Sequence, residues 1–322
     1  MTIAVCTLFE KDYHHGVAAL VNSLLRGGFV GRVYAGYRGP PPPWAGRAVP
    51  MVIEGWPGAS LLAVETRCEI AFLPMRTPAH FTNIKPDFML QLFAQPSLGI
   101  DKLFYLDPDI CMTETWQFMT DWISCGVALC EDINSPVEQH HPRREGWRRH
   151  FGAHGISFEF PTAAYVNGGC VGVSRAELCF LENWQRLSQH MAGIIGGLGA
   201  SLLEGGDHIQ HLGFGRCFDR SDQDVLNAAI GMTRGVNYSI LPQTAMAFCP
   251  GATVLPHAIG PAKPWRRRYL RDTLRGRPPG APDKAFWSSA DGPLSSVSAA
   301  QIRRQRASIR LASAIGRWYQ RR

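Results

Sequence analysis

The sequence predicts an α/β protein built around an open, mostly parallel sheet that is flanked by helices. Strand-like and helix-like segments alternate through the first third of the chain. The strand-like runs are short and almost wholly apolar, which is typical of strands buried in a parallel sheet. Charged residues follow directly where such a run ends, at the edge where open α/β sheets bind ligands. With 322 residues, 45% of them hydrophobic, the chain can bury a large core.

The elements expected in the first third of the chain are short strands separated by helices and loops. Strands are predicted at residues 2–8, 33–37, 49–53, 69–73 and 103–106, and helices at residues 13–25 and 85–93. Further on, Ser174 and Glu177 have the spacing of a capping box and predict a helix that extends to about residue 191. Residues 140–154 mix basic side chains with histidines and are expected to form an exposed insertion. Residues 193–206 are glycine-rich and are expected to form a loop.

The positive charge of the chain is concentrated at its C-terminal end. The seven arginines between residues 292 and 322 account for the whole net charge of +7, and no acid lies among them. A basic surface for nucleic acid is therefore not expected on the rest of the protein. We predict a main domain over residues 1–271, a linker rich in Pro, Gly and Ser over residues 272–295, and a basic amphipathic helix over residues 296–322.

Two interpretations of this C-terminal helix stay open. Its arginines, together with Trp318 and Tyr319, suit the surface of an anionic membrane. The apolar residues Ile302, Ile309 and Ala312 lie roughly on one side and could equally pack against the main domain.

The chain is expected to be cytoplasmic. No apolar run reaches the roughly 18 residues of a membrane-spanning helix, and the first residues have the pattern of a strand rather than of a signal peptide. The nine cysteines show no paired spacing, which fits a reducing compartment. Binding of the C-terminal helix to lipid would place the protein peripherally at the inner face of the membrane.

Asp107 and Asp109 follow the apolar run 103–106 and are separated by a single proline. Carboxylate oxygens are the hard ligands that divalent cations such as Mn²⁺ and Mg²⁺ bind in proteins. The proline fixes one backbone angle between the two acids and would stiffen the pair. A turn at the end of a strand accounts for the same residues equally well.

A second group of candidate residues follows the strand-like residues 252–255. A neutral imidazole at His257 suits Mn²⁺ as a third protein ligand. Gly260 would allow the backbone to approach a phosphate closely, and Lys263 would place a positive charge beside it. A lone histidine in this setting is more often structural, but the whole string from His257 to Trp265 is far more specific than any one of its members.

Three further sites admit both a functional and a structural interpretation. Asp222 and Gln223 begin a short helix, and they either contact a sugar or cap that helix. Asn167 and Gly168 lie between two strand-like runs, where they either hold a sugar or form a bulge. Lys85 begins a helix and either reaches a diphosphate or is solvated, as most lysines are.

In this order, the motifs resemble retaining glycosyltransferase family 8, which includes bacterial lipopolysaccharide galactosyl- and glucosyltransferases and glycogenin. The similarity extends from about Thr2 to about Trp265. It implies a GT-A fold, the fold of nucleotide-diphospho-sugar transferases, for the main domain. It also implies that a Mn²⁺ (or Mg²⁺) ion is held by Asp107, Asp109 and His257.

The resemblance further implies roles for the other motif residues. Gln223 would lie at the reacting face of the donor, Asp222 would bind the sugar, and Lys263 would contact the diphosphate. The remaining substrate contacts would come from Thr7, Tyr13, Lys85, Asp132, Asn167, Gly168 and Gly260. Of these, Thr7 and Tyr13 would lie at the nucleotide base.

The resulting hypothesis is a metal-dependent retaining hexosyltransferase that moves a hexose from a UDP-sugar to a glycan or lipid-linked acceptor. One alternative is an inverting GT-A transferase or a nucleotidyltransferase, of which the inverting enzyme would need a general base beside the acceptor. The other is a non-catalytic, transferase-like protein that docks on membranes.

Overall fold

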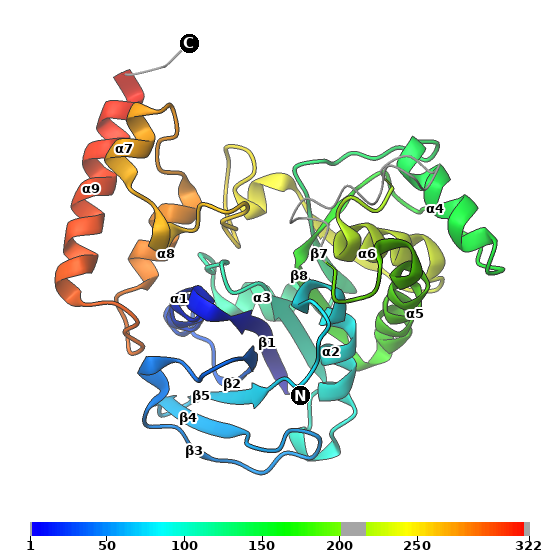
Figure 1. Cartoon of the computed structure of the whole chain (residues 1–322), viewed down its shortest axis with the longest axis horizontal. Coiled ribbons are helices and arrows are strands. Elements are labelled where there is room, and N and C mark those ends of the chain that lie inside the picture. The colour runs from blue at the N-terminus through cyan, green and yellow to red at the C-terminus, as the bar shows by residue number, and fades with distance from the viewer. Residues whose placement is uncertain (1, 201–216, 319–322) are drawn as a thin grey trace. The chain divides into compact units, whose positions relative to one another are not determined.

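A computed structural model describes residues 2–200 and 217–318 of the chain and shows a mixed α/β fold (Figure 1). The strands of these residues are β1 (Ile3–Glu10), β2 (Gly31–Arg38), β3 (Val49–Pro50), β4 (Ser60–Glu65), β5 (Cys68–Pro74), β6 (Lys102–Leu106), β7 (Val127–Glu131), β8 (Val166–Ser174) and β9 (Tyr238–Leu241). The helices are α1 (His14–Arg26), α2 (Lys85–Phe93), α3 (Trp116–Trp122), α4 (Pro142–Gly152), α5 (Leu178–Ile195), α6 (Ser221–Met232), α7 (Tyr269–Leu274), α8 (Ala281–Ser289) and α9 (Ala299–Trp318).

The strands of the described residues form one sheet in the order β3-β4-β5-β2-β1-β6-β8-β7-β9. Strand β1 pairs in parallel with β6, β2 with β5, and β7 with β9. Antiparallel pairs join β3 to β4, β4 to β5, and β7 to β8. The predicted α/β fold around a mostly parallel sheet, with a helix at the C-terminal end, is thus confirmed.

Each strand and helix expected in the first third of the chain is present. The predicted helix at residues 85–93 has the bounds of α2, whereas the strand expected at residues 49–53 ends early as β3. Strand β4 has no counterpart among the predicted strands. Its residues are half-exposed and include Glu65, because only one of its faces is covered, so it lacks the apolar run of a central strand.

The chain divides into two compact units, and the first consists of Met1–Cys6, Arg76–Tyr105 and Thr120–Gln243. Within this unit, β8 passes so close to β6 that a Cβ atom on Gly172 would lie 2.5 Å from the Phe104 ring. The capping box predicted at Ser174 and Glu177 is present, and α5 begins at the next residue. The glycine-rich residues 193–206, expected to be a loop, begin inside α5 and lie partly outside the described residues.

The exposed insertion expected at residues 140–154 is wrong in one respect, because the segment forms the partly buried helix α4 of the first unit. Trp147 and Phe151 are completely buried. They stand four residues apart, so they share one face of the helix. The basic residues and histidines of this segment hide that apolar face in the sequence.

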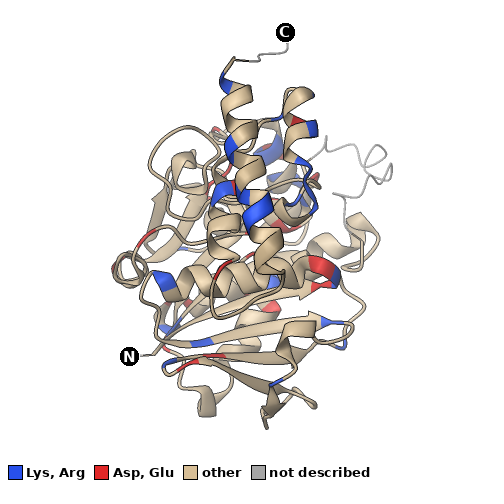
Figure 2. Cartoon of the chain, turned by 90° about the vertical axis from the view of Figure 1, so that its left-hand side faces the viewer, with Lys and Arg blue, Asp and Glu red and all other residues tan. Residues whose placement is uncertain are grey.

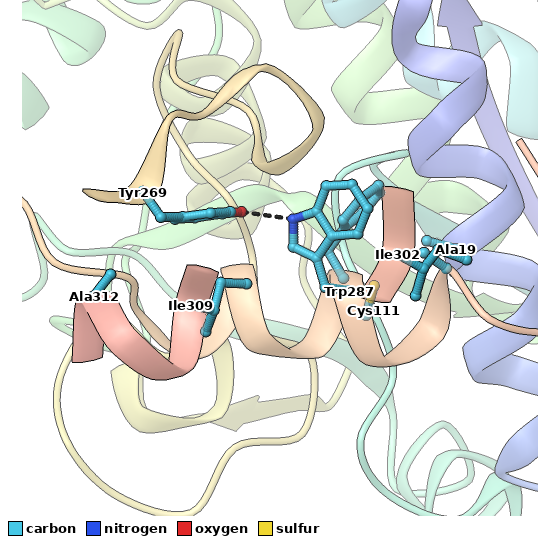
Figure 3. Packing of buried hydrophobic residues seen from close by; sticks show 9 residues of the cluster. Ala19, Cys111, Tyr269, Trp287, Ile302, Ile309 and Ala312 are labelled. Atoms are coloured by element: carbon cyan, nitrogen blue, oxygen red, sulfur yellow. Dashed lines mark hydrogen bonds between the residues drawn. The ribbon is translucent and has the colours of Figure 1, made fainter. Parts of the chain in front are cut away.

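The second unit consists of Thr7–Met75, Leu106–Met119 and Thr244–Arg322. Its C-terminal helices α7, α8 and α9 build a core of their own, drawn in Figure 3. At its centre the Trp287 indole donates a hydrogen bond to the Tyr269 hydroxyl, with a distance of 2.7 Å. Ala19 of α1 and Cys111 belong to the same core.

Helix α8 lies inside residues 272–295, which were expected to be a linker, so that description is wrong for Ala281–Ser289. The Pro, Gly and Ser content of the segment predicts a linker, but Phe286 and Trp287 are buried in the core of the second unit. Two large aromatic side chains are enough to fix a short helix by packing. The boundary of the main domain at residue 271 stays a prediction.

Helix α9 packs through its apolar face, as one of the two interpretations of the tail expected. Ile302, Ile309 and Ala312 are all buried against the other C-terminal helices. The basic residues lie on the remaining surface, and Figure 2 shows them as blue bands along this helix. Among the described residues, no helix combines the length and the apolar character needed to cross a membrane.

Replacing Ile309 with Ala should lower the free energy of unfolding by about 3 kcal/mol, because the side chain is 6% exposed and its loss leaves a cavity. Leu311, two residues along the same helix, is 54% exposed, and Leu311→Ala should change stability by less than about 0.5 kcal/mol. Urea unfolding of both variants checks the prediction. Equal effects would mean that α9 does not pack as described.

Candidate active site

The structure brings Asp107, Asp109 and His257 together in the second unit. One ligand atom from each residue lies within 4.8 Å of the other two. The His257 Nε2 atom is 3.2 Å from Asp109 Oδ1 and 3.7 Å from Asp107 Oδ2. Two carboxylates and one imidazole form a donor set that suits a hard or borderline divalent cation. The cluster could therefore hold a metal ion.

Backbone hydrogen bonds fix these residues from two distant parts of the chain. Strand β6 ends at Leu106, and the turn that follows is closed by a bond of 3.1 Å from the Ile110 amide to the Asp107 carbonyl. Ile110 forms an antiparallel bridge with His257, and the Ala258 amide donates to the Asp109 carbonyl at 3.1 Å. Residues 252–255 are strand-like in the sequence but form no strand in the structure. The isolated bridge at His257 follows them.

Gly16 of α1 allows the Asp-Pro-Asp turn to sit directly on that helix. A Cβ atom at position 16 would lie 2.1 Å from the carbonyl oxygen of Pro108. Any larger residue would have to move the backbone between the two acids. Gly16 was not among the predicted site residues, because a glycine inside a helix gives no local sign of what it contacts.

Lys263 completes this cluster. Its ammonium group donates hydrogen bonds to Asp109 Oδ2 and, at 2.8 Å, to the Ala258 carbonyl. Burial raises the pKa of Asp109, but attraction to His257 and Lys263 outweighs it and holds that pKa well below its ordinary value. Gly260 has a φ of +81°, a left-handed conformation that favours glycine and turns the loop back toward the cluster.

Tyr13 lies against the same loop, within the short helix Lys11–Tyr13. The Lys263 ammonium is 5.6 Å from the centre of its ring, and Trp265 packs edge-on to it at 5.5 Å. Asp12 also contacts this loop. It accepts a hydrogen bond of 2.9 Å from the Trp265 indole and forms an ion pair with Arg266. Asp12 therefore holds the loop through Trp265, the last residue of the motif, and through Arg266, which follows it.

Thr7, the other residue predicted at the nucleotide base, is completely buried in β1. Its hydroxyl has no hydrogen-bond partner within residues 2–200 and 217–318. The structure does not test its predicted contact with the base, and that role stays a prediction.

Lys85 lies in a second cluster, in the first unit, and is not solvated. Its side chain is 2% exposed. The ammonium donates a hydrogen bond of 2.8 Å to the Gly168 carbonyl and lies 3.2 Å from Asp222 Oδ2. It also lies 5.0 Å from the centre of the Tyr105 ring. A buried ammonium needs such partners, so Lys85 fixes the position of Asp222.

Asn167, Gln223 and Asp132 belong to this second cluster as well. The Asn167 amide donates to Asp132 Oδ2 at 2.8 Å and to Gln223 Oε1 at 3.2 Å. The Gln223 Nε2 atom is buried and makes no hydrogen bond within the described part of the chain, although the side chain lies beside the Tyr165 hydroxyl. The predicted role of Gln223 at the reacting face of the donor stays a prediction.

The structure bears on the bulge interpretation of Asn167 and Gly168, and their predicted contact with a sugar stays a prediction. These residues lie in one continuous strand, but its pairing with β7 shifts between Leu129 and Glu131, so the backbone is irregular there. A Cβ atom on Gly168 would come within 3.2 Å of Asp222 Oδ2, so the glycine leaves room for the second cluster.

The acids that begin α6 have different tasks. The Asp224 carboxylate reaches back from the first turn and accepts a hydrogen bond of 2.9 Å from the amide of Arg220, the N-cap residue, whose own side chain makes no cap hydrogen bond. Asp222 and Gln223 face the second cluster instead and contact Lys85 and Asn167. Asp224 therefore stabilises the start of the helix, and the sugar-binding role of Asp222 and Gln223 stays a prediction.

Arg143 and Tyr165 connect this helix start to α4, and neither was predicted. The Arg143 guanidinium and the Tyr165 hydroxyl donate to Asp224 Oδ1 at 3.0 and 2.7 Å. Burial raises the pKa of Asp224 to about 7, although both donors act in the opposite direction. Arg143 is one of several arginines in a segment that the sequence predicts to be exposed, so nothing near it in the sequence indicates its pairing with Asp224.

Replacing Arg143 with Met should destabilise the protein in a pH-dependent way. The folded pKa of Asp224 is raised above its unfolded value, so the contribution of this carboxyl to stability declines as pH rises toward 7. Without Arg143 that pKa rises further and the decline continues. The destabilisation should then grow above pH 7 by up to about 1.4 kcal/mol per pH unit.

Urea unfolding between pH 5 and pH 9 measures this effect. Arg148→Met is the matched control on α4, because Arg148 pairs with the more exposed Glu145. Its effect should stay below about 1 kcal/mol and should not vary over the same range. If the loss in free energy of unfolding caused by Arg143→Met did not vary with pH, Arg143 would not be the group that favours the ionised form of Asp224.

A comparison with solved structures finds several glycosyltransferases that are similar to this chain. The galactosyltransferase LgtC, in complex with donor and acceptor sugar analogs, matches with a TM-score of 0.51 and 16% identity, over 94% of this chain and 99% of LgtC. The bifunctional glycosyltransferase WbbM matches with a TM-score of 0.48 and 13% identity, over 94% of this chain and 51% of WbbM. The glycosyltransferase GlyE of Streptococcus pneumoniae TIGR4 matches with a TM-score of 0.45 and 15% identity, over 97% of this chain and 64% of GlyE.

No family model matches the sequence, and no curated protein matches it. We base the fold assignment on LgtC, and at this identity the likeness establishes the fold alone. The chain therefore has the GT-A glycosyltransferase fold that its motifs implied, with an Asp-Asp-His cluster that could bind a metal ion.

Proposed function

We propose that the protein is a metal-dependent retaining glycosyltransferase that moves a hexose from a UDP-sugar to a glycan or lipid-linked acceptor. The observation that carries this proposal is the convergence of Asp107, Asp109 and His257 on one point, with Lys263 hydrogen-bonded to the same cluster. Sugar transfer from a nucleotide donor requires that the charge of the departing diphosphate be neutralised. A bound Mn²⁺ (or Mg²⁺) ion would supply this as a Lewis acid.

Lys263 would hold the diphosphate. An ammonium group is a point charge with three donors, so it suits phosphate oxygens in several orientations. Gly260 supports this assignment, since its left-handed backbone keeps the loop free of a side chain at that point. Tyr13, whose ring lies beside Lys263, is the residue that we assign to the nucleotide base together with Thr7.

The sugar would be bound by the second cluster. Asp222 and Asn167 would bind the hydroxyl groups, and Gln223 would use its unpartnered nitrogen at the reacting face of the donor. Lys85 and Asp132 would position these residues through the contacts described above. Gly168 would leave space for the ring.

Asp224 is not a candidate for the general base that an inverting enzyme would need. An inverting enzyme needs a carboxylate or imidazole near the acceptor to act as a base, with a pKa near the working pH. The pKa of Asp224 is raised to about 7, but the residue is completely buried and bonded to Arg143 and Tyr165. It is therefore not available to an acceptor hydroxyl.

Replacing Asp109 with Asn should reduce transfer from a UDP-hexose by roughly a hundredfold or more, because a charge that acts on the leaving group is lost. Glu54→Gln, an equivalent change at an exposed position, should leave the rate unchanged. The measurement is release of the nucleoside diphosphate, UDP or GDP, with Mn²⁺ and after treatment with a chelator, over a panel of UDP- and GDP-sugars.

The anomeric configuration of the product, read by NMR, completes the test. A product with the configuration of the donor supports the retaining mechanism, and an inverted product contradicts it. If Asp109→Asn retains full, metal-independent turnover, the assignment of the metal centre is wrong. If the wild type turns over no sugar nucleotide at all, the non-catalytic alternative is favoured.

We also propose that the C-terminal helices attach the protein to anionic membranes, which would suit a lipid-linked acceptor. With the apolar face of α9 buried, the contact would come from its exposed arginines and from Trp318, which is 90% exposed. A groove of about 600 Å³ between α8 and α9 is lined by Lys284, Arg306, Arg310 and Arg317. Four cationic side chains around one groove suit the phosphate of a lipid headgroup.

Replacing Arg310 and Arg317 with Gln should weaken binding to phosphatidylserine vesicles by roughly 30-fold, since each basic residue contributes about 1 kcal/mol near such a surface. Arg47 and Arg67 are equally exposed and lie elsewhere in the second unit, so their double Gln variant is the control. Co-sedimentation at about 0.1 M salt measures both. Unchanged binding of the first variant would exclude this surface.

A further inference from the structure

Lys263 and His257 lie at different oxygens of the Asp109 carboxylate. The lysine ammonium donates to Oδ2, and the imidazole Nε2 lies 3.2 Å from Oδ1. All three residues are nearly inaccessible to solvent, since Asp109 is 9% exposed and the other two are 6% exposed. The contact between the Lys263 ammonium and this carboxylate is therefore poorly screened by water.

A divalent cation in the same cluster would need a lone pair of Asp109. It would also lie within a few ångströms of the lysine ammonium, and two positive charges at that separation repel strongly where water is excluded. The ammonium on one oxygen of Asp109 and a cation on the other would therefore repel each other, so the contact with Lys263 opposes the binding of a cation by Asp107, Asp109 and His257.

We propose that Lys263 is the internal counter-ion of the metal centre, and that it exchanges its contact with Asp109 for one with the donor's diphosphate when the cation binds. This inference rests on the proposed function, and it adds an order of events to it. In the exchange no covalent bond forms or breaks, and the lysine keeps its proton. The singly charged ammonium leaves the carboxylate as the doubly charged cation arrives.

Lys263 can leave Asp109 because its other contacts do not involve that carboxylate. The four-carbon stem is flexible, and the Ala258 carbonyl, at 2.8 Å, can keep one of the three ammonium protons bound. The Tyr13 ring, 5.6 Å from the ammonium, offers a further contact that tolerates movement. A diphosphate would give the displaced charge a new partner of opposite sign.

The exchange predicts that the cation and the nucleoside diphosphate bind cooperatively. Without a diphosphate, the cation must displace Lys263 with no compensation for the lysine. With a diphosphate, the displaced ammonium is paired again, so each ligand raises the affinity for the other. Part of this coupling passes through Lys263, and the rest comes from direct contact between cation and phosphate.

The test is to replace Lys263 with Met and to measure Mn²⁺ binding to the full-length protein by isothermal titration calorimetry, first without and then with UDP. Without UDP, we expect Lys263→Met to bind Mn²⁺ at least about tenfold more tightly than the wild type, a change of about 1.4 kcal/mol. The gain in Mn²⁺ affinity that UDP provides should be smaller in the variant than in the wild type.

Arg266→Met is the matched control, because Arg266 is a cation of the same loop but pairs with Asp12 and not with Asp109. It should bind Mn²⁺ without UDP no more tightly than the wild type. If Lys263→Met binds Mn²⁺ no more tightly than the wild type, while Asp109→Asn loses binding, the exchange is wrong and the metal centre stands. If Asp109→Asn binds Mn²⁺ as the wild type does, the metal centre itself is wrong and the exchange with it.

A second measurement does not depend on how well the variants fold. A crystal structure of the wild type with Mn²⁺ and UDP should show the Lys263 ammonium on a phosphate oxygen. If the ammonium remained on Asp109 Oδ2 with both ligands bound, the proposal would be overturned.

Discussion

The buried carboxylate of Asp109 is the constraint on which the metal centre depends. A buried charge is unfavourable unless other charges and hydrogen bonds compensate for it. Here the compensation comes from His257 and Lys263, which lie on a loop far along the chain. The same loop is tied to the Asp109 backbone by the Ala258 amide. One electrostatic requirement therefore determines where this loop must run.

The same physics orders the first unit. Lys85 is buried among Asp222, the Gly168 carbonyl and the Tyr105 ring, so the charge is paired and the helix start is held in place. Asn227 adds a neutral clamp, since its side chain both accepts from the Val166 amide at 2.7 Å and donates to the Val166 carbonyl at 2.8 Å. The paired hydrogen bonds of Asn227 and the ion pair of Lys85 favour one arrangement of α6 against β8.

The C-terminal helices follow a different rule. Their position depends on apolar packing, with the bond between Trp287 and Tyr269 at the centre (Figure 3). Because this packing uses the apolar side of α9, its arginines remain on the surface (Figure 2). A helix of this composition can be both an integral part of the second unit and a basic surface. The two interpretations of the tail are thus compatible.

The sequence alone predicted the central strands, helices α1 and α2, and the residues Asp107, Asp109 and His257, which the structure brings together. These features depend on neighbouring residues, such as an apolar run that ends in charges, and local patterns report them. Tertiary structure alone decided that Lys263 pairs with Asp109, 154 positions away, that Lys85 is buried, and that Arg143 reaches Asp224. Burial and charge pairing are properties of the folded chain, because they depend on which distant segments exclude water from one another.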